Sequence, residues 1–399
     1  MAAPRERHVP RLSAVLREEE RVTPLELFFD LLFVLAVTQC TALMADEPTW
    51  EGLAKGTLVL GVLWWSWVGY AWLTSVVDPE EGSVRIAMFA AMAAFLIVAI
   101  SVPRAFADLS LTFAVGYAVV RLAHIALFLL ASRDDPGLRK STVGLGGSTA
   151  IAVGLLTGAS FLDGTAQGGL WAVALALDLA GPFFFGAEGW KLVPGHFAER
   201  HGLVVIIALG ESIVAIGVGA EKSLTAGVAT AAVVAIALIA AMWWAYFDVV
   251  AAVTARRLAT TAEGRERNSM ARDAYSYMHF PMVLGVVLVA LGLKTTLAHV
   301  GDPLERVPAV ALVGGAALYL LGQVAFLLRT VGSLGSQRLL AALVIVAMLP
   351  IAFEVPALLT LGLVTVALWA LNAYEAVRLS AMRDRVRHRR RPEALAPET

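Results

Sequence analysis

The chain consists mainly of long apolar runs separated by short polar segments, and each run extends over about 20 residues. A helix of about this length crosses the roughly 30 Å hydrocarbon layer of a bilayer. Within the runs the apolar residues are continuous and do not alternate with polar ones, which favours helices over the strands of a membrane barrel. The pattern therefore predicts an all-α polytopic membrane bundle of about twelve transmembrane helices, at 24–44, 53–75, 84–104, 110–131, 140–162, 166–187, 201–220, 224–253, 274–297, 308–331, 337–353 and 356–377.

Composition strengthens this prediction. Of the 399 residues, 59% are hydrophobic and only 16% are charged, and the mean hydropathy is +0.75. A soluble domain has roughly 25% charged residues, so the chain lacks the polar surface that water requires. The lipid bilayer is the expected partner.

Charge and cysteine content exclude two further features. The near-equal numbers of basic and acidic residues, 31 and 32, give no reason to expect nucleic acid as a partner. The single cysteine excludes an intrachain disulfide.

The distribution of Lys and Arg predicts the orientation in the membrane. With twelve helices and an inner N-terminus, 25 of the 31 basic residues lie on the inner side. Four lie outside, and Arg121 and Lys294 fall within predicted helices. Because cytoplasmic loops carry the excess positive charge, we expect a protein of the cell inner membrane with both termini cytoplasmic. The basic C-terminal tail either fixes this topology or also binds anionic lipid headgroups.

Two dipeptides recur at an offset of 179 residues. Glu20-Arg21 is followed by Glu199-Arg200, and Trp64-Trp65 by Trp243-Trp244. Since six helices separate the copies, such a repeat would be parallel. The predicted organisation is a cytoplasmic N-terminal tail at 1–23, two six-helix halves at 24–197 and 198–378, and a basic cytoplasmic C-terminal tail at 379–399.

Two motifs give the chain a family resemblance. Residues 23–34 read TPLELFFDLLFV, and 199–203 read ERHGL, followed by IIALGES at 206–212. In these segments, and across about residues 18–380, the chain resembles the bacterial low temperature requirement A family of multi-pass membrane proteins. The resemblance implies a polytopic protein of the cell membrane and does not define an activity.

Three ionisable residues are predicted at a similar depth near the bilayer centre. By helical rise, Glu211 lies about 15 Å into its helix, and Asp178 and Arg121 lie roughly 18 Å and 16 Å from the outer ends of theirs. His124 is on the same helical face as Arg121, one turn closer to the cytoplasm. Charged groups within a bilayer usually face the bundle interior or a cavity. We therefore expect Arg121, Asp178 and Glu211 to surround an internal chamber.

Each of the two acids also has a purely structural interpretation. Pro182 deprives the Asp178 carbonyl of its helical partner, which favours a site for a proton, a cation or a donor-bearing substrate, or else a simple kink. Burial is expected to keep Glu211 neutral unless Arg121 pairs with it. A neutral Glu211 carboxyl can exchange protons. Alternatively, an ion pair between Glu211 and Arg121 can hold two helices together.

Glu26 and Asp30 are spaced i,i+4, so both carboxylates lie on one face of the first predicted helix. Two adjacent acids are typical of a proton acceptor or a cation ligand. Alternatively, acids are favoured near a helix N-terminus by its partial positive charge. We expect Asp30, the deeper of the two, to have the functional role.

Catalytic signatures are missing from the sequence. The segment from His196 to His201 spaces its histidines at i,i+5 and matches neither common zinc-hydrolase pattern, and no nucleophile elbow or phosphate-binding loop occurs. We therefore expect no cofactor, and the sequence favours a protein that is not an enzyme. The leading hypothesis is a proton- or ion-coupled secondary transporter of an unidentified small-molecule or ion substrate. An embedded enzyme acting on a lipid or isoprenoid, and a proton or ion channel, remain alternatives.

Overall fold

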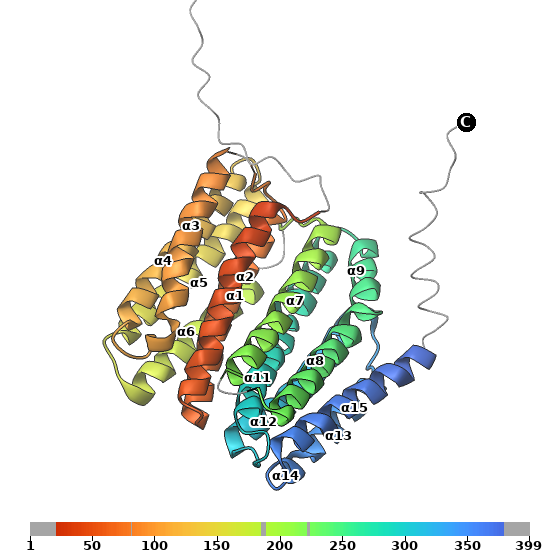
Figure 1. Cartoon of the computed structure of the whole chain (residues 1–399). Coiled ribbons are helices and arrows are strands. Elements are labelled where there is room, and N and C mark those ends of the chain that lie inside the picture. Colours follow the sequence, from red (N-terminus) through yellow and green to blue (C-terminus); the bar gives the residue numbers. More distant parts are fainter. Residues whose placement is uncertain (1–20, 81, 185–188, 222–223, 379–399) are drawn as a thin grey trace, which may run out of the picture.

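The computed structural model describes residues 21–80, 82–184, 189–221 and 224–378. Both tails predicted to be cytoplasmic lie largely outside these residues, including the basic C-terminal segment for which topology and lipid-headgroup binding were the two alternatives. The described part is a helical bundle (Figure 1), and the strand-like pairing found in it is an isolated bridge between Pro303 and Pro356. The helices are α1 Pro24–Asp46, α2 Trp50–Thr74, α3 Gly82–Ser101, η1 Val102–Arg104, α4 Ser110–Ala131, α5 Pro136–Ala159, α6 Gly164–Phe184, α7 Pro194–Gly219, α8 Ala226–Phe247, α9 Val250–Thr260, α10 Arg265–Met270, η2 Ala271–Tyr277, α11 His279–Ala298, α12 Arg306–Val331, α13 Ser336–Ala347, α14 Leu349–Ala352 and α15 Ala357–Arg378.

The predicted polytopic all-α fold is confirmed. Ten helical segments of the described chain are long and apolar enough to cross a membrane. Helix α6 and the shorter apolar segment Ser336–Ala352 account for the other two predicted spans. Large apolar side chains such as Ile86, Leu122, Val233 and Val366 are exposed on the outside of the bundle. Such a surface is suited to contact with lipid rather than water.

Several helix ends follow from local sequence. Thr23 accepts the backbone N–H of Glu26 while the Glu26 side chain accepts the N–H of Thr23, and this capping box starts α1 with a proline in its first turn. Thr49 and Thr225 cap α2 and α8 with their side-chain oxygens. Side-chain caps of this kind satisfy N–H groups that a helix leaves free at its start.

Two predicted boundaries are wrong. Helix α7 begins at Pro194, seven residues before the predicted start at 201, because its polar first turns are buried against α1 rather than exposed in a loop. The segment predicted as a loop at 254–273 is mostly helical. It contains the end of α9, all of α10 and part of η2, a stretch of π-helix from Ala271 to Tyr277 that leads into α11.

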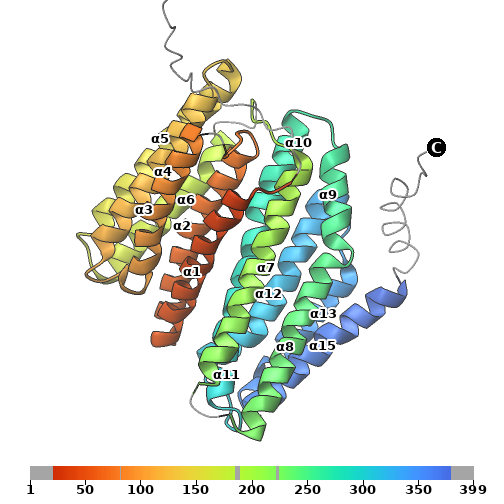
Figure 2. The ribbon, with the colours of Figure 1, turned by 45° about the horizontal axis from the view of Figure 1, so that its top comes forward.

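The helices form two groups, α1–α6 and α7–α15, which lie side by side (Figure 2). In the first group, α1 packs against α2 and α3, and successive contacts join α3, α4, α5 and α6 before α6 returns to α2. In the second, α7 packs against α8 and α11, and contacts join α11, α12, α13 and α15 before α15 returns to α8. This matching order of neighbours is what a parallel duplication would produce, and the division into halves at 197/198 stays a prediction.

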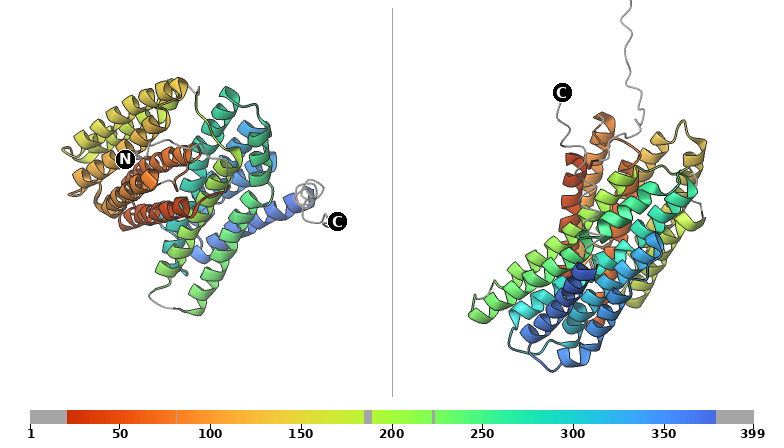
Figure 3. Two further views of the ribbon diagram at one scale, coloured as in Figure 1. Left: turned by 90° about the horizontal axis from the view of Figure 1, so that it is seen from above. Right: turned by 90° about the vertical axis from the view of Figure 1, so that its right-hand side faces the viewer.

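The two groups meet along α1 and α7, as seen from above in Figure 3. Within the second group, α11 and α12 approach so closely that their glycines touch the facing backbone. A Cβ atom at Gly315 would lie 2.7 Å from the carbonyl oxygen of Gly285, and one at Gly292 would lie 2.8 Å from the backbone of Leu312. Small residues allow such close packing of helices in a membrane.

Candidate functional site

The seam between α1 and α7 contains a buried cluster of four ionisable side chains. The Arg200 guanidinium lies 3.1 Å from Glu26 Oε1 through Nη1 and donates to Asp30 Oδ1 at 2.8 Å through Nη2. His196 Nε2 is 2.8 Å from the same oxygen of Glu26. None of the four residues is more than 1% exposed. We call Glu26, Asp30, His196 and Arg200 the seam cluster.

Neighbouring groups on α2 hold the seam cluster in place. The indole N–H of Trp67 donates to Asp30 Oδ1 at 2.9 Å, and the Trp67 ring lies 5.6 Å from the Arg200 guanidinium. The hydroxyl of Ser75 is 3.0 Å from His196 Nδ1. Asp30 Oδ2 is buried without a hydrogen-bond partner among the described residues. Because buried polar atoms normally find partners, this oxygen marks the part of the cluster best placed to hold a proton.

Glu26 makes two kinds of contact. Through Oε2 it accepts the Thr23 N–H at 2.8 Å and so acts as a capping residue, and through Oε1 it faces His196 and Arg200. Its role as a proton acceptor or cation ligand stays a prediction. Asp30, one turn further along α1, contacts Trp67 and Arg200.

Glu211 occupies a separate site nearer the other end of α7. Its Oε2 accepts a 2.5 Å hydrogen bond from Thr38 on α1, and its carboxylate is within electrostatic range of Lys294 on α11. The true start of α7 at Pro194 places Glu211 about 26 Å along the helix rather than 15 Å, beyond the middle. The expectation that it faces Arg121 and Asp178 is therefore wrong.

Arg121 and Asp178 do meet, inside the first helical group. Arg121 Nη2 donates to Asp178 Oδ1 at 3.0 Å and to the Thr149 hydroxyl at 2.8 Å, and Tyr117 donates to Asp178 Oδ2 at 3.2 Å. Both charged residues are at most 2% exposed. The Asp178 carboxylate is thus neutralised by a guanidinium, and the alternative in which it forms an open seat for a cation does not fit its contacts. His124 lies beside the pair with its ring against the backbone of Gly69.

A third buried ion pair lies in the second helical group. Arg338 on α13 donates to Glu375 on α15 at 2.8 Å from Nε and 2.6 Å from Nη2, and it also contacts Gln323 on α12. Each group thus has an internal guanidinium–carboxylate pair whose acid is on its last helix, Asp178 in one and Glu375 in the other. The seam cluster differs because its charges come from both groups.

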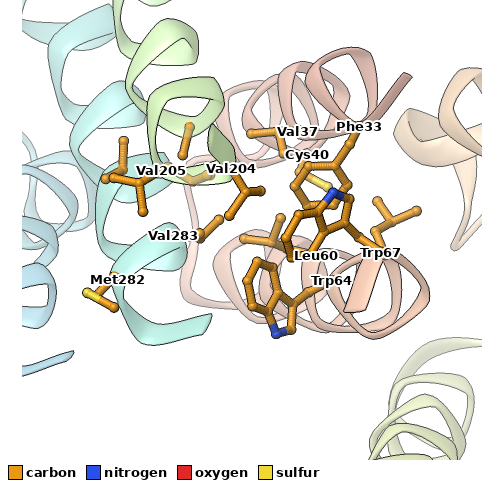
Figure 4. Close-up of a cluster of buried hydrophobic side chains, with 14 of the residues drawn as sticks. Phe33, Val37, Cys40, Leu60, Trp64, Trp67, Val204, Val205, Met282 and Val283 are labelled. Carbon is orange, nitrogen blue, oxygen red and sulfur yellow. The ribbon is translucent and has the colours of Figure 1, made fainter. Parts of the chain in front are cut away.

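An apolar layer separates the seam cluster from Glu211. Along α1 the layer contains Phe33 and Val37, and along α7 it contains Val204 and Val205, all of them fully buried. Figure 4 shows these side chains with Leu60, Trp64 and Trp67 of α2 and Met282 and Val283 of α11. The two polar sites of the seam are therefore divided by closely packed hydrocarbon and aromatic groups.

His196 and Arg200 are the functional candidates that the sequence analysis missed. Their i,i+4 spacing on α7 matches the i,i+4 spacing of Glu26 and Asp30 on α1, and this matched spacing is a signal in the sequence. By itself it does not indicate that the two helices are neighbours or that these faces meet. Within the described residues no group of three His, Cys, Asp or Glu side chains is arranged to hold a metal ion.

Comparison with known proteins agrees with this architecture. Residues 21–373 match the family described as bacterial low temperature requirement A protein (LtrA). The chain is also 30% identical to "Uncharacterized protein RA0937" of Rhizobium meliloti (strain 1021) over 376 residues, which cover 89% of this chain and 90% of that one. No solved structure matches. The motifs at the start of α1 and in α7, which carried the predicted resemblance, lie within the matched region. The chain belongs to the bacterial low temperature requirement A family of membrane proteins.

Proposed function

We propose that the protein is a proton-coupled secondary transporter of a small molecule in the cell inner membrane, with both termini in the cytoplasm. The observation that carries the proposal is the seam cluster, in which acids of the first helical group are bound to a guanidinium and an imidazole of the second. A change in protonation there acts on the contact between the two groups, which is where a rocking transporter must open and close.

Counting charges supports a proton at this site. Two carboxylates face one guanidinium, so the fully ionised acids leave the cluster with a net negative charge unless one proton is added. Burying an uncompensated charge is costly, which favours the neutral arrangement with a proton on His196 or on one of the acids. Losing that proton weakens the balance that holds α1 against α7, and this is the coupling we propose.

The hollows of the bundle favour transport over a channel. A cavity of about 50 Å³ lies at the end of the bundle where α1 begins, and a hollow of about 410 Å³ lies at the opposite end, beside Lys294 and the loop between α11 and α12. The apolar layer on the seam lies between the two ends. A hollow near each end with an apolar barrier between them suits alternating access better than a continuous proton file.

The first test concerns Asp30. Substrates would be identified by comparing the metabolites of deletion and overexpressing cells, and the strongest candidate would be assayed in proteoliposomes. We expect an imposed proton gradient to drive its accumulation with the wild type. With Asp30→Asn we expect accumulation to fall at least tenfold, while gradient-free exchange of labelled for unlabelled substrate continues, because the substitution keeps the shape but removes the proton site.

The controls separate the remaining hypotheses. Asp108→Asn, which changes an exposed acid paired with Arg104, should behave like the wild type. Proton flow under a potential without any substrate would instead indicate a channel. A candidate compound that is chemically altered but not moved would indicate an embedded enzyme, and equal accumulation by Asp30→Asn and wild type would refute the proposed coupling.

Glu211 provides a second prediction on the far side of the apolar layer. Glu211→Gln keeps a side chain that can accept from Thr38 but cannot ionise, so we expect the protein to fold and proton-driven accumulation to fall at least tenfold. Glu221→Gln, an exposed position just beyond α7, is the matched control and should leave transport unchanged. Normal transport of a verified substrate by Glu211→Gln would remove this residue from the mechanism.

A further inference from the structure

The cavity near the start of α1 is formed by both helical groups. Its walls include Trp65 and Trp72 of α2, Arg121 and His124 of α4, and Pro182 of α6, and the second group closes it with Arg272 and Ser276 of the π-helical segment η2. A volume of about 50 Å³ leaves room for one or two water-sized groups, since a water takes up about 30 Å³ in the liquid. π-Helical segments are frequent at functional sites.

Hydrogen-bond donors without partners gather at this cavity. Arg121 Nε is buried without a hydrogen-bond partner among the described residues, and so are both ring nitrogens of His124, one of which carries a hydrogen in the neutral ring. The Ser276 hydroxyl accepts a 2.9 Å hydrogen bond from the Trp72 indole, so its own hydrogen is free to point elsewhere. Buried donors are normally satisfied, which indicates a ligand that accepts hydrogen bonds.

The charges around the cavity give the sign of that ligand. The charged side chains that line the cavity are both guanidinium groups, Arg121 and Arg272, and the carboxylates that pair with them, Asp178 and Asp273, are not part of its wall. A positive site with inward donors in a partly apolar wall is suited to an anion.

We propose that this cavity binds a small monovalent anion, no larger than acetate, between Arg121, His124 and Arg272. The anion would accept hydrogen bonds from the free donors and face the two guanidinium groups of the wall. It would also connect the two helical groups at the end where α1 begins, because Arg272 belongs to one group and Arg121 to the other. The inference goes beyond the proposed function, since binding of this kind requires no transport.

The test uses purified full-length protein in detergent with bromide as the probe. Bromide replaces gluconate, which is too large for the cavity, at constant ionic strength. We expect a saturable rise in thermal midpoint, accompanied by a saturable change in tryptophan fluorescence. Arg272→Gln should raise the half-saturating bromide concentration about tenfold, in line with the loss of one charged hydrogen bond.

Arg329→Gln is the matched control, because Arg329 pairs with the same carboxylate as Arg272 but does not line the cavity. Its half-saturating concentration should stay within about twofold of the wild-type value. His124→Phe keeps an aromatic ring among Tyr70 and Phe128, so it should fold normally and lose the response to bromide. The proposal is overturned if wild type shows no saturable response, if Arg272→Gln and Arg329→Gln behave alike, or if His124→Phe folds and responds as wild type does.

Discussion

Replacing Arg200 by methionine is expected to lower the free energy of unfolding by about 3–5 kcal/mol, the usual cost of removing one partner from a buried ion pair. The guanidinium contacts both Glu26 and Asp30, and none of the three residues is more than 1% exposed, so its loss leaves two buried carboxylates without their cation. Unfolding of the purified protein in mixed micelles with increasing SDS would measure the change.

Two further variants show whether charge is the cause. Arg104→Met removes a guanidinium from an exposed pair with Asp108 and should cost less than about 1 kcal/mol. Adding Glu26→Gln and Asp30→Asn to Arg200→Met makes the cluster neutral and should restore more than half of the lost stability. The charge-balance account of the seam would be contradicted if Arg200→Met alone unfolded at the same SDS content as the wild type. It would also be contradicted if the triple variant recovered none of the lost stability.

Gly315→Ala should have the second largest effect, a loss of about 3 kcal/mol. The added methyl group would meet the carbonyl oxygen of Gly285 at 2.7 Å, and this backbone atom cannot move aside as a flexible side chain can. The two helices must separate or bend, and overpacking of this kind costs about 1–3 kcal/mol in soluble cores. The same SDS titration would measure it.

The preceding residue offers a matched control. At Gly314 the nearest atom to an added Cβ is a Val310 methyl at 3.6 Å, an ordinary contact. Gly314→Ala should therefore be neutral or stabilise by up to about 1 kcal/mol, since alanine is the better helix former. Equal effects of the two substitutions would show that the close approach of α11 and α12 does not determine their stability.

The helical spans were predictable because lipid requires long apolar runs, and each predicted run overlaps one or more helices of the described residues. The start of α7 was not predictable from hydropathy. Its first turns contain His196 and Arg200, which look like loop residues until the acids of α1 are placed opposite them. Hydropathy cannot distinguish polar residues that are buried by a distant partner from polar residues of a loop.

The arrangement of the candidate residues was harder to predict than the helices. Arg121 and Asp178 were assigned a common depth and do form a pair. Glu211 was assigned the same depth, but the error of seven residues in the start of α7 displaced it by about 10 Å. These helices are apolar on all sides, so the sequence contains little information about which face of each helix meets which neighbour.

The seam cluster has a consequence for biosynthesis. Asp30 and Arg200 are separated by 170 residues in the chain. At about 5–20 residues per second, ribosomes need roughly 10–30 s to make that stretch. During this interval the newly inserted first helix already carries both carboxylates, while the segment that will bind them has not been translated. A product truncated before α7 therefore retains both acids without the guanidinium that pairs with them in the full chain.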